Sequence, residues 1–117
     1  MNILRHQWKN MIKAVNVMPE FESTGLWDHE SRIMVPFEDL KVPLDIRHML
    51  NEWIEFYDNS FEEDYITFKP FRTNIFNEWG RRIAIALKKE LPTIDVYYIG
   101  EDESGTHEPE FIKTEEK

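Results

Sequence analysis

Hydrophobic side chains recur every three or four residues along three stretches of the chain, which is the spacing of one face of an α-helix. The first stretch predicts a short amphipathic helix over residues 3–14. The second predicts a helix that begins with Pro43 in its first turn and fades at Asn59 and Ser60. Its off-stripe residue Phe56 is expected to be exposed. Its buried stripe is expected to consist of Ile46, Met49, Leu50, Trp53, Ile54 and Tyr57.

The third stretch predicts a helix from Asn74, a good N-cap residue, to about Leu91, just before Pro92. Glu78 and Arg82 lie one turn apart and are expected to pair. Gly80 costs about 1 kcal/mol relative to alanine inside a helix, and a close approach by another backbone would explain it. The buried face is expected to consist of Ile75, Phe76, Trp79, Ile83, Ala86, Leu87 and Leu91.

Short runs rich in β-branched and aromatic residues indicate strands outside these helices. Residues 94–99 read as a strand that Gly100 ends. Residues 17–18 begin another before Pro19, and residues 32–35 and 65–68 are weaker candidates. This order predicts an α+β fold in which a small sheet packs against two or three helices. Residues 1–117 are expected to form one domain, with 104–117 as a mobile acidic tail in which Phe111 and Ile112 are the residues able to dock.

The stretch EFESTGLWDHE at residues 20–30 gathers acids and aromatics around one glycine. Gly25 is expected to adopt a backbone angle that a side chain would hinder, and Trp27 to pack inward as an anchor. A metal site at Asp28, His29 and Glu30 is disfavoured, because adjacent residues of an extended segment point to opposite sides and no histidine pair has zinc-ligand spacing. The acids expected to face water or a partner are Glu20, Glu22, Asp28 and Glu30.

The composition excludes several classes of function. There is no cysteine, so disulfides, thiolate metal sites and cysteine nucleophiles are excluded. There is no G-x-S-x-G motif and no glycine-rich phosphate loop. The formal net charge of -9 disfavours nucleic-acid binding. These absences lead us to expect no catalytic residues and no cofactors. No run approaches the roughly 18 apolar residues of a membrane span, and the N-terminus is too polar for a signal peptide, so we expect a cytoplasmic protein.

Electrostatically, the most uniform part of the chain runs from His48 through Phe68, where no Lys or Arg occurs and acids alternate with aromatics. Two interpretations remain open. The span is a solvated surface, or it contacts a cationic partner with exposed aromatics as anchors. Together with the acids of the 20–30 stretch, the candidate partner-binding residues are Asp28, Glu30, Glu52, Glu55, Phe56, Asp58, Glu62, Glu63 and Asp64.

Five segments occur in an order that resembles a group of small bacterial immunity proteins. They are MPEFESTGLWD, VPFEDLKVPLD, LNEWIEFYD, FNEWGRRIAIALKKEL and IDVYYIGEDE, within about residues 17–103. The resemblance implies a cytoplasmic inhibitor that neutralises a toxin of contact-dependent or other polymorphic systems. It supplies no catalytic residues.

The leading hypothesis is therefore a non-enzymatic immunity protein that occludes the basic site of a cognate toxin domain, a nuclease being one candidate. The partner would be a protein rather than nucleic acid or a membrane, and a monomer is favoured. One alternative is a small enzyme of unrecognised type, which predicts a concave pocket with carboxylates of perturbed pKa. Another is a homo-oligomeric structural or regulatory subunit that associates through exposed aromatics.

Overall fold

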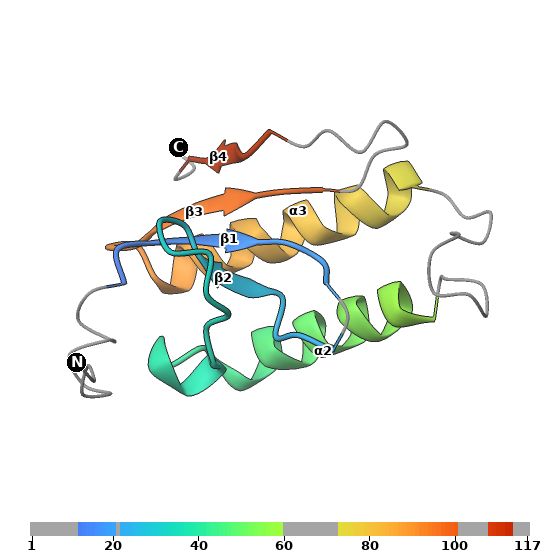
Figure 1. Cartoon of the computed structure of the whole chain (residues 1–117), viewed down its shortest axis with the longest axis horizontal. Helices are drawn as coiled ribbons and strands as arrows, with labels where there is room; N and C mark the ends of the chain where they lie inside the picture. The colour runs from blue at the N-terminus through green and yellow to red at the C-terminus, as the bar shows by residue number, and fades with distance from the viewer. Residues whose placement is uncertain (1–11, 21, 60–72, 101–107, 114–117) are drawn as a thin grey trace.

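A computed structural model describes residues 12–20, 22–59, 73–100 and 108–113. Two helices and a four-stranded mixed sheet form an α+β fold, as the sequence predicts (Figure 1). In chain order the elements are β1 (Ala14–Val17), β2 (Leu26–Asp28), the 3-10 helix η1 (Phe37–Asp39), α2 (Leu44–Asp58), α3 (Thr73–Glu90), β3 (Asp95–Tyr98) and β4 (Glu110–Ile112).

The strand order in the sheet is β2-β1-β3-β4, with β1 and β3 in the centre. These two strands are parallel, whereas β2 and β4 pair antiparallel with their neighbours. Beyond β2 the predicted strand over residues 32–35 is reduced to an isolated bridge between Trp27 and Met34. Backbone hydrogen bonds join Asp28 to Ile33 and Leu26 to Val35 on either side of this bridge.

Successive side chains alternate between the two faces of the sheet. One face supplies the core together with α2 and α3, and α3 lies behind β1 and β3 in the view of Figure 1 while α2 runs below them. Its buried side chains are Val15, Val17, Leu26, Val96, Tyr98 and Ile112. The opposite face has no helix against it among the described residues. The molecule is therefore built of two layers, helices on one side and an open sheet face on the other.

Helices α2 and α3 follow their apolar patterns at most positions. In α2, five of the six stripe residues are buried and Met49 packs partly against the core, while Pro43 precedes the helix as its N-cap instead of entering the first turn. In α3, the expected burial of Ile75 is wrong, since this side chain is 53% exposed. Ala84 is fully buried in its place. The centre of the buried stripe of α3 runs through Phe76, Gly80, Ile83 and Leu87, which turns position 75 toward solvent.

Chain ends show the largest departures from the sequence expectations. Residues 3–11 of the predicted first helix lie outside the described residues, as does the strand expected at 65–68. At Ala14 the helix prediction is wrong, because β1 begins there and pairs on both sides. Near the other end, residues 110–112 form β4 instead of belonging to a mobile tail. The expected docking of Ile112 is confirmed by its 4% exposure, whereas Phe111 stays exposed.

Glycines mark two tight places in the fold. Gly25 has a φ of 82°, which confirms the expected backbone angle. At Gly80 an added β-carbon would lie 2.5 Å from Cζ2 of Trp53 and 2.6 Å from Cε1 of Tyr98. Two aromatic rings, not another backbone, therefore account for the glycine in α3.

Candidate functional site

The turn after β2 uses one of the candidate acids as a structural group. Asp28 is only 7% exposed, and its carboxylate accepts a hydrogen bond from the backbone N–H of Ser31 at 2.7 Å. Its own carbonyl accepts from the backbone of Arg32. The expectation that Asp28 faces water is wrong, because its side chain lies on the helix-covered face and closes the turn.

Trp27 is half-buried, and its Nε1 donates to the carbonyl of Met18, so the ring is fixed against the end of β1.

Glu30 is exposed as expected, in the turn that follows β2. The backbone of His29 donates to the carbonyl of Ala14, which places this turn at the start of β1. Glu22 follows the end of β1. The sheet therefore separates Glu30 from the acids that gather near Glu22, and the structure does not bring all the candidate residues together.

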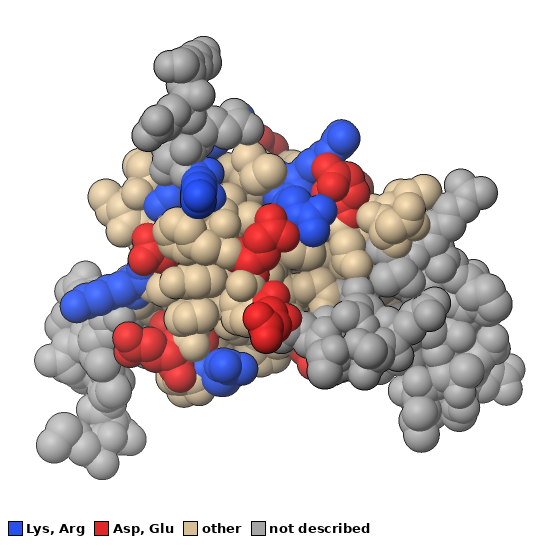
Figure 2. All heavy atoms as spheres, turned by 90° about the horizontal axis from the view of Figure 1, so that it is seen from above, with Lys and Arg blue, Asp and Glu red and all other residues tan. Residues whose placement is uncertain are grey.

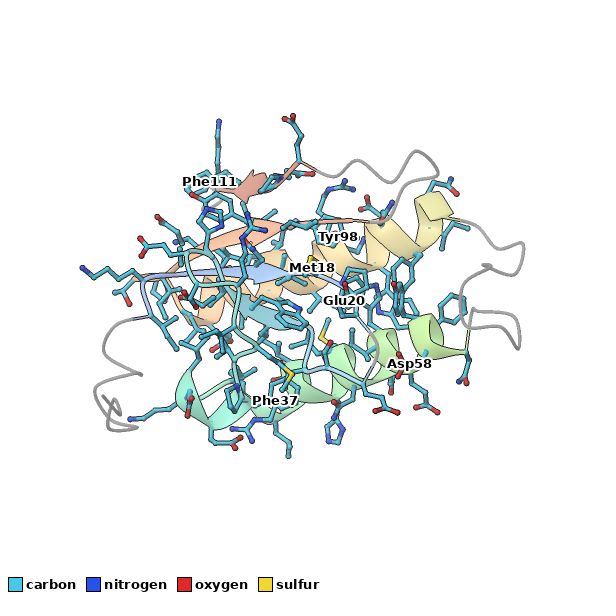
Figure 3. The ribbon with its side chains drawn as sticks, in the orientation of Figure 1. Met18, Glu20, Phe37, Asp58, Tyr98 and Phe111 are labelled. Carbon is cyan, nitrogen blue, oxygen red and sulfur yellow. The ribbon has the colours of Figure 1, made fainter. Side chains whose placement is uncertain are left out.

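The other described candidates lie on the C-terminal half of α2. Glu52, Glu55 and Asp58 follow one another at three-residue steps, so they share one side of the helix. Glu52 and Glu55 are exposed. Both carboxylate oxygens of Asp58, at the C-terminal end of α2 (Figure 3), accept from the backbone N–H of Glu22 at 3.3 Å. We call this group, with Phe56, the α2 acidic surface: Glu22, Glu52, Glu55, Phe56 and Asp58.

One carboxylate of this surface, that of Asp58, has a shifted pKa. Burial raises the pKa of Asp58 above its ordinary value, and the nearby charge of Glu22 raises the pKa further. The hydrogen bond from the Glu22 backbone opposes both effects, because it favours the charged carboxylate. The pKa is raised overall because burial, the largest of the three effects, outweighs the hydrogen bond, and the repulsion from Glu22 is the smallest of them.

The basic residue of α2 points away from the acidic surface. Nε of Arg47 donates to the carbonyl of Val42 at 2.7 Å, and its guanidinium lies 5.7 Å from the ring centroid of Phe37. Both contacts are at the N-terminal end of the helix, where Phe37 lies in Figure 3. Residues 48–59 contain neither Lys nor Arg. Within the described part of α2, the acids of the C-terminal half therefore face solvent with no cation of their own helix beside them.

One aromatic side chain borders the acids of α2, one turn after Glu52. Phe56 is 43% exposed, which confirms its predicted exposure. Its ring stacks on Phe76 with centroids 6.0 Å apart and meets the edge of Trp79 at 5.8 Å. An exposed but buttressed aromatic ring loses little side-chain entropy when a partner covers it. Glu62, Glu63 and Asp64, the remaining candidates, lie outside the described residues.

A separate hollow of about 890 Å³ lies along the N-terminal half of α3. Glu78 is paired there with Arg81 at 3.0 Å and with Arg82 at 3.2 Å, and Arg81 also reaches Glu110 at 3.0 Å. The hydrogen bond from Arg82 is the first cause that lowers the pKa of Glu78, and the ion pair with Arg81 adds to it. A carboxylate whose charged form is favoured by two arginines is suited to structure more than to proton transfer. The hollow is lined by Asn74, Ile75, Asn77, Glu78, Trp79, Arg81 and Arg82.

Charge on the face seen in Figure 2 is mixed, with blue and red side chains next to one another. This differs from the α2 acidic surface, whose charged members are all acidic. Among the described residues there is no group of three metal-ligating side chains. No helix in the same part of the chain is long and apolar enough to cross a membrane.

Residues 13–101 match the family described as Serratia CdiI immunity protein-like. The chain belongs to this family. The match runs from just before β1 to just after β3 and includes both helices, and it confirms the immunity-type resemblance seen in the sequence. No curated protein matches the chain. Membership in the CdiI immunity protein-like family supports a toxin-neutralising role in which the chain binds a cognate toxin protein, and it favours an inhibitor over an enzyme.

Proposed function

We propose that this protein neutralises its cognate toxin by placing the α2 acidic surface over a basic site of the toxin domain. The observation that carries the proposal is the pair of exposed acids Glu52 and Glu55 on α2, which Asp58 and Glu22 extend at the end of the helix, with the exposed ring of Phe56 one turn after Glu52. A one-sign surface of this kind fits a cationic partner, because complementary charge guides encounter and suppresses wrong partners.

Occlusion is the mechanism that this surface supports. Carboxylates on α2 present negative oxygens much as phosphates do, so a toxin site built to bind phosphate would bind them. A nuclease domain is the kind of toxin that fits this chemistry best, since its substrate is a polyanion. Charge steering would accelerate association, and burial of Phe56 would slow dissociation.

Co-expression tests the proposal in cells. The toxin domain encoded by the gene immediately upstream is induced with and without this protein, and surviving cells are counted. We expect the domain alone to be lethal, the pair to survive, and a complex to co-purify. Killing that persists while this protein accumulates in soluble form would contradict the proposal for that pair.

A second measurement separates occlusion from other modes of neutralisation. The purified toxin domain is assayed on DNA and RNA with increasing amounts of this protein, and competition is measured against a phosphate-rich polymer such as heparin. Occlusion predicts loss of nucleic-acid cleavage at a one-to-one ratio and mutual exclusion with the polymer. A complex that still binds the polymer would place the contact away from the basic site.

A further inference from the structure

The open face of the sheet carries a continuous row of large side chains. Register pairs Asn16 with Trp27 on one side and with Tyr97 on the other, and Tyr97 with Phe111. The bridge between Trp27 and Met34 extends the row by one more residue. These five residues come from five separate segments and share one face of the sheet, opposite the helices. We call the row Met34, Trp27, Asn16, Tyr97 and Phe111 the aromatic sheet face.

Contacts within the face fix its side chains in place. The ring of His29 stacks on Tyr97 with centroids 4.0 Å apart and an interplanar angle of 8°. Nδ1 of His29 lies 2.7 Å from Oδ1 of Asn16, which is only 1% exposed. Phe111 meets Tyr97 edge-on at 5.3 Å. The face is therefore preorganised, and binding to it would cost little side-chain entropy.

Exposure of this face is highest at the two ends of the row. Phe111 is 47% exposed and Met34 is 40% exposed, while Trp27 and Tyr97 between them are half-buried. The other large exposed hydrophobic residues in the described chain are Ile33, which alternates to the opposite face, and three residues dispersed over the helices. An exposed aromatic and thioether cluster on a rigid flat surface is typical of the centre of a protein–protein contact.

Topology brings charges of both signs to one end of the aromatic sheet face. The starts of β1 and β3 and the ends of β2 and β4 meet there, because the central strands are parallel and the outer strands antiparallel. The exposed charged side chains on these ends are Lys13, Glu30, Arg32, Asp95 and Lys113. Three are basic and two are acidic, so this border is nearly neutral although the whole chain carries -9.

The balance of basic and acidic side chains at this border favours a second copy of the chain as the partner. Two copies of this chain repel each other through their net charge, and most strongly through their α2 acidic surfaces. At the aromatic sheet face the repulsion is small, and a two-fold axis parallel to the strands would set basic residues of one copy against acidic residues of the other. A flat sheet also packs readily on another sheet at a spacing of about 10 Å.

We propose that the aromatic sheet face is a homodimer interface, in which the face of one copy packs on the same face of a second copy. Four strands of three or four residues, about 4.8 Å apart, together with the bridge at Met34 cover roughly 300 Å² per copy, so the contact has the size of a weak, transient interface. The dimer is therefore reversible and concentration-dependent. It leaves the α2 acidic surface accessible, since Phe111 and Asp58 lie at opposite borders of the molecule in Figure 3.

Sedimentation velocity of the full chain over roughly 5 to 500 μM tests the proposal, a range that covers weak interfaces. We expect the monomer to convert to dimer as concentration rises. Phe111→Glu should raise the dimer dissociation constant at least about tenfold. Leu44→Glu is the matched control, since Leu44 is 69% exposed on α2 and the change adds the same charge away from the face. The dimer dissociation constant of Leu44→Glu should stay within about twofold of that of the original protein, because only the general charge repulsion between the two copies changes.

Met34→Glu provides a second variant on another segment of the face and should act like Phe111→Glu. Circular dichroism melts of each variant show whether the monomer is folded. A monomer at every concentration would overturn the proposal, and so would equal weakening by Phe111→Glu and Leu44→Glu. If the protein is monomeric at every concentration and Phe111→Glu abolishes toxin binding, the face belongs to the toxin contact and the dimer proposal is overturned.

Discussion

Asp58, the last residue of α2, accepts hydrogen bonds from the backbone nitrogen of Glu22 through both carboxylate oxygens, each at 3.3 Å. Glu22 has a φ of 53°, in the left-handed region that non-glycine residues adopt rarely. The contact thus ties the segment that leaves β1 to the end of α2 and stabilises an unusual backbone angle. It also places two acids side by side, which begins the α2 acidic surface.

This contact predicts a pH dependence of stability. Burial raises the pKa of Asp58, so in the pH range between its unfolded and folded pKa values the folded chain binds more protons than the unfolded chain. Asp58 therefore opposes folding once the pH is above its folded pKa, and this cost disappears as the pH falls through that value. Asp58→Asn keeps an oxygen acceptor for the Glu22 N–H and should stabilise the protein at pH 7 by less than about 0.5 kcal/mol, because the group is largely solvated.

Urea unfolding between about pH 3 and pH 7 measures this effect. The difference between Asp58→Asn and the original protein should shrink toward the acidic end of the range. Glu52→Gln, which removes one charge from the same surface without a hydrogen bond to the backbone of Glu22, controls for net charge. A destabilisation by Asp58→Asn that is largest at pH 7 would show that the carboxylate charge stabilises the turn instead.

Charge reversal on α2 tests the toxin contact directly. Glu52→Lys combined with Glu55→Lys should slow association with the toxin by about tenfold or more, because steering depends on the sign of the surface. Dissociation should change less. Stopped-flow or surface plasmon resonance at low and high salt measures both rates, and the effect should decrease with salt.

A matched double variant, Glu90→Lys with Glu108→Lys, changes the net charge equally at exposed positions outside the α2 acidic surface. It should reduce the association rate by only about twofold, through general charge. Equal slowing by the two double variants would assign steering to net charge alone. An unchanged rate for the α2 variant would remove this helix from the interface.

Gly80→Ala tests the packing of α3 on its neighbours. Alanine improves helix propensity by about 1 kcal/mol, but its β-carbon would overlap the rings of Trp53 and Tyr98. Overpacking of this kind costs about 1–3 kcal/mol or more, so we expect a net loss of stability in urea unfolding. Asn51→Ala on the exposed side of α2 gives the propensity effect alone. A gain of stability at position 80 would mean that the two rings move apart easily.

Ile112→Ala tests whether β4 belongs to the folded core. Ile112 is 4% exposed and pairs in register with Val96 of the central strand β3. Removing a buried side chain of this size should cost about 2–5 kcal/mol. Lys113→Ala, one residue further and exposed, should change stability by less than about 0.5 kcal/mol. Equal unfolding midpoints for the two variants would contradict the contribution of β4.

The sequence predicts α2 and α3 well because a helix places its apolar residues by local spacing. The stripe from Ile46 to Tyr57 packs as its spacing indicates, and Phe56 is exposed for the same reason. Three of the candidate acids, Glu52, Glu55 and Asp58, share one side of α2 by the same periodicity. Local pattern therefore establishes most of the α2 acidic surface before any tertiary contact is known.

Features that depend on distant pairing are not visible in this way. Ala14 lies in a segment with helical spacing, yet pairing with β3 and a backbone hydrogen bond from His29 make it part of a strand. Asp28 looks like one more surface acid until its hydrogen bond to Ser31 shows that it closes a turn. Glu22 joins the α2 acidic surface only through Asp58, and the aromatic sheet face combines segments that no local window contains.

The central pairing of the sheet also has a consequence for biosynthesis. β1 near the N-terminus lies beside β3, which the ribosome makes only after both helices, and Ala14 finds its partner in Asp95. Parallel contacts over such sequence separation form slowly, because a long loop must close before any contact forms. Both helices and β3 must therefore be translated before the central strands can pair, and until then Val15 and Val17 have no sheet partner on that side. A cell that makes this protein consequently gains a complete sheet only after the segment that follows α3 has been synthesised.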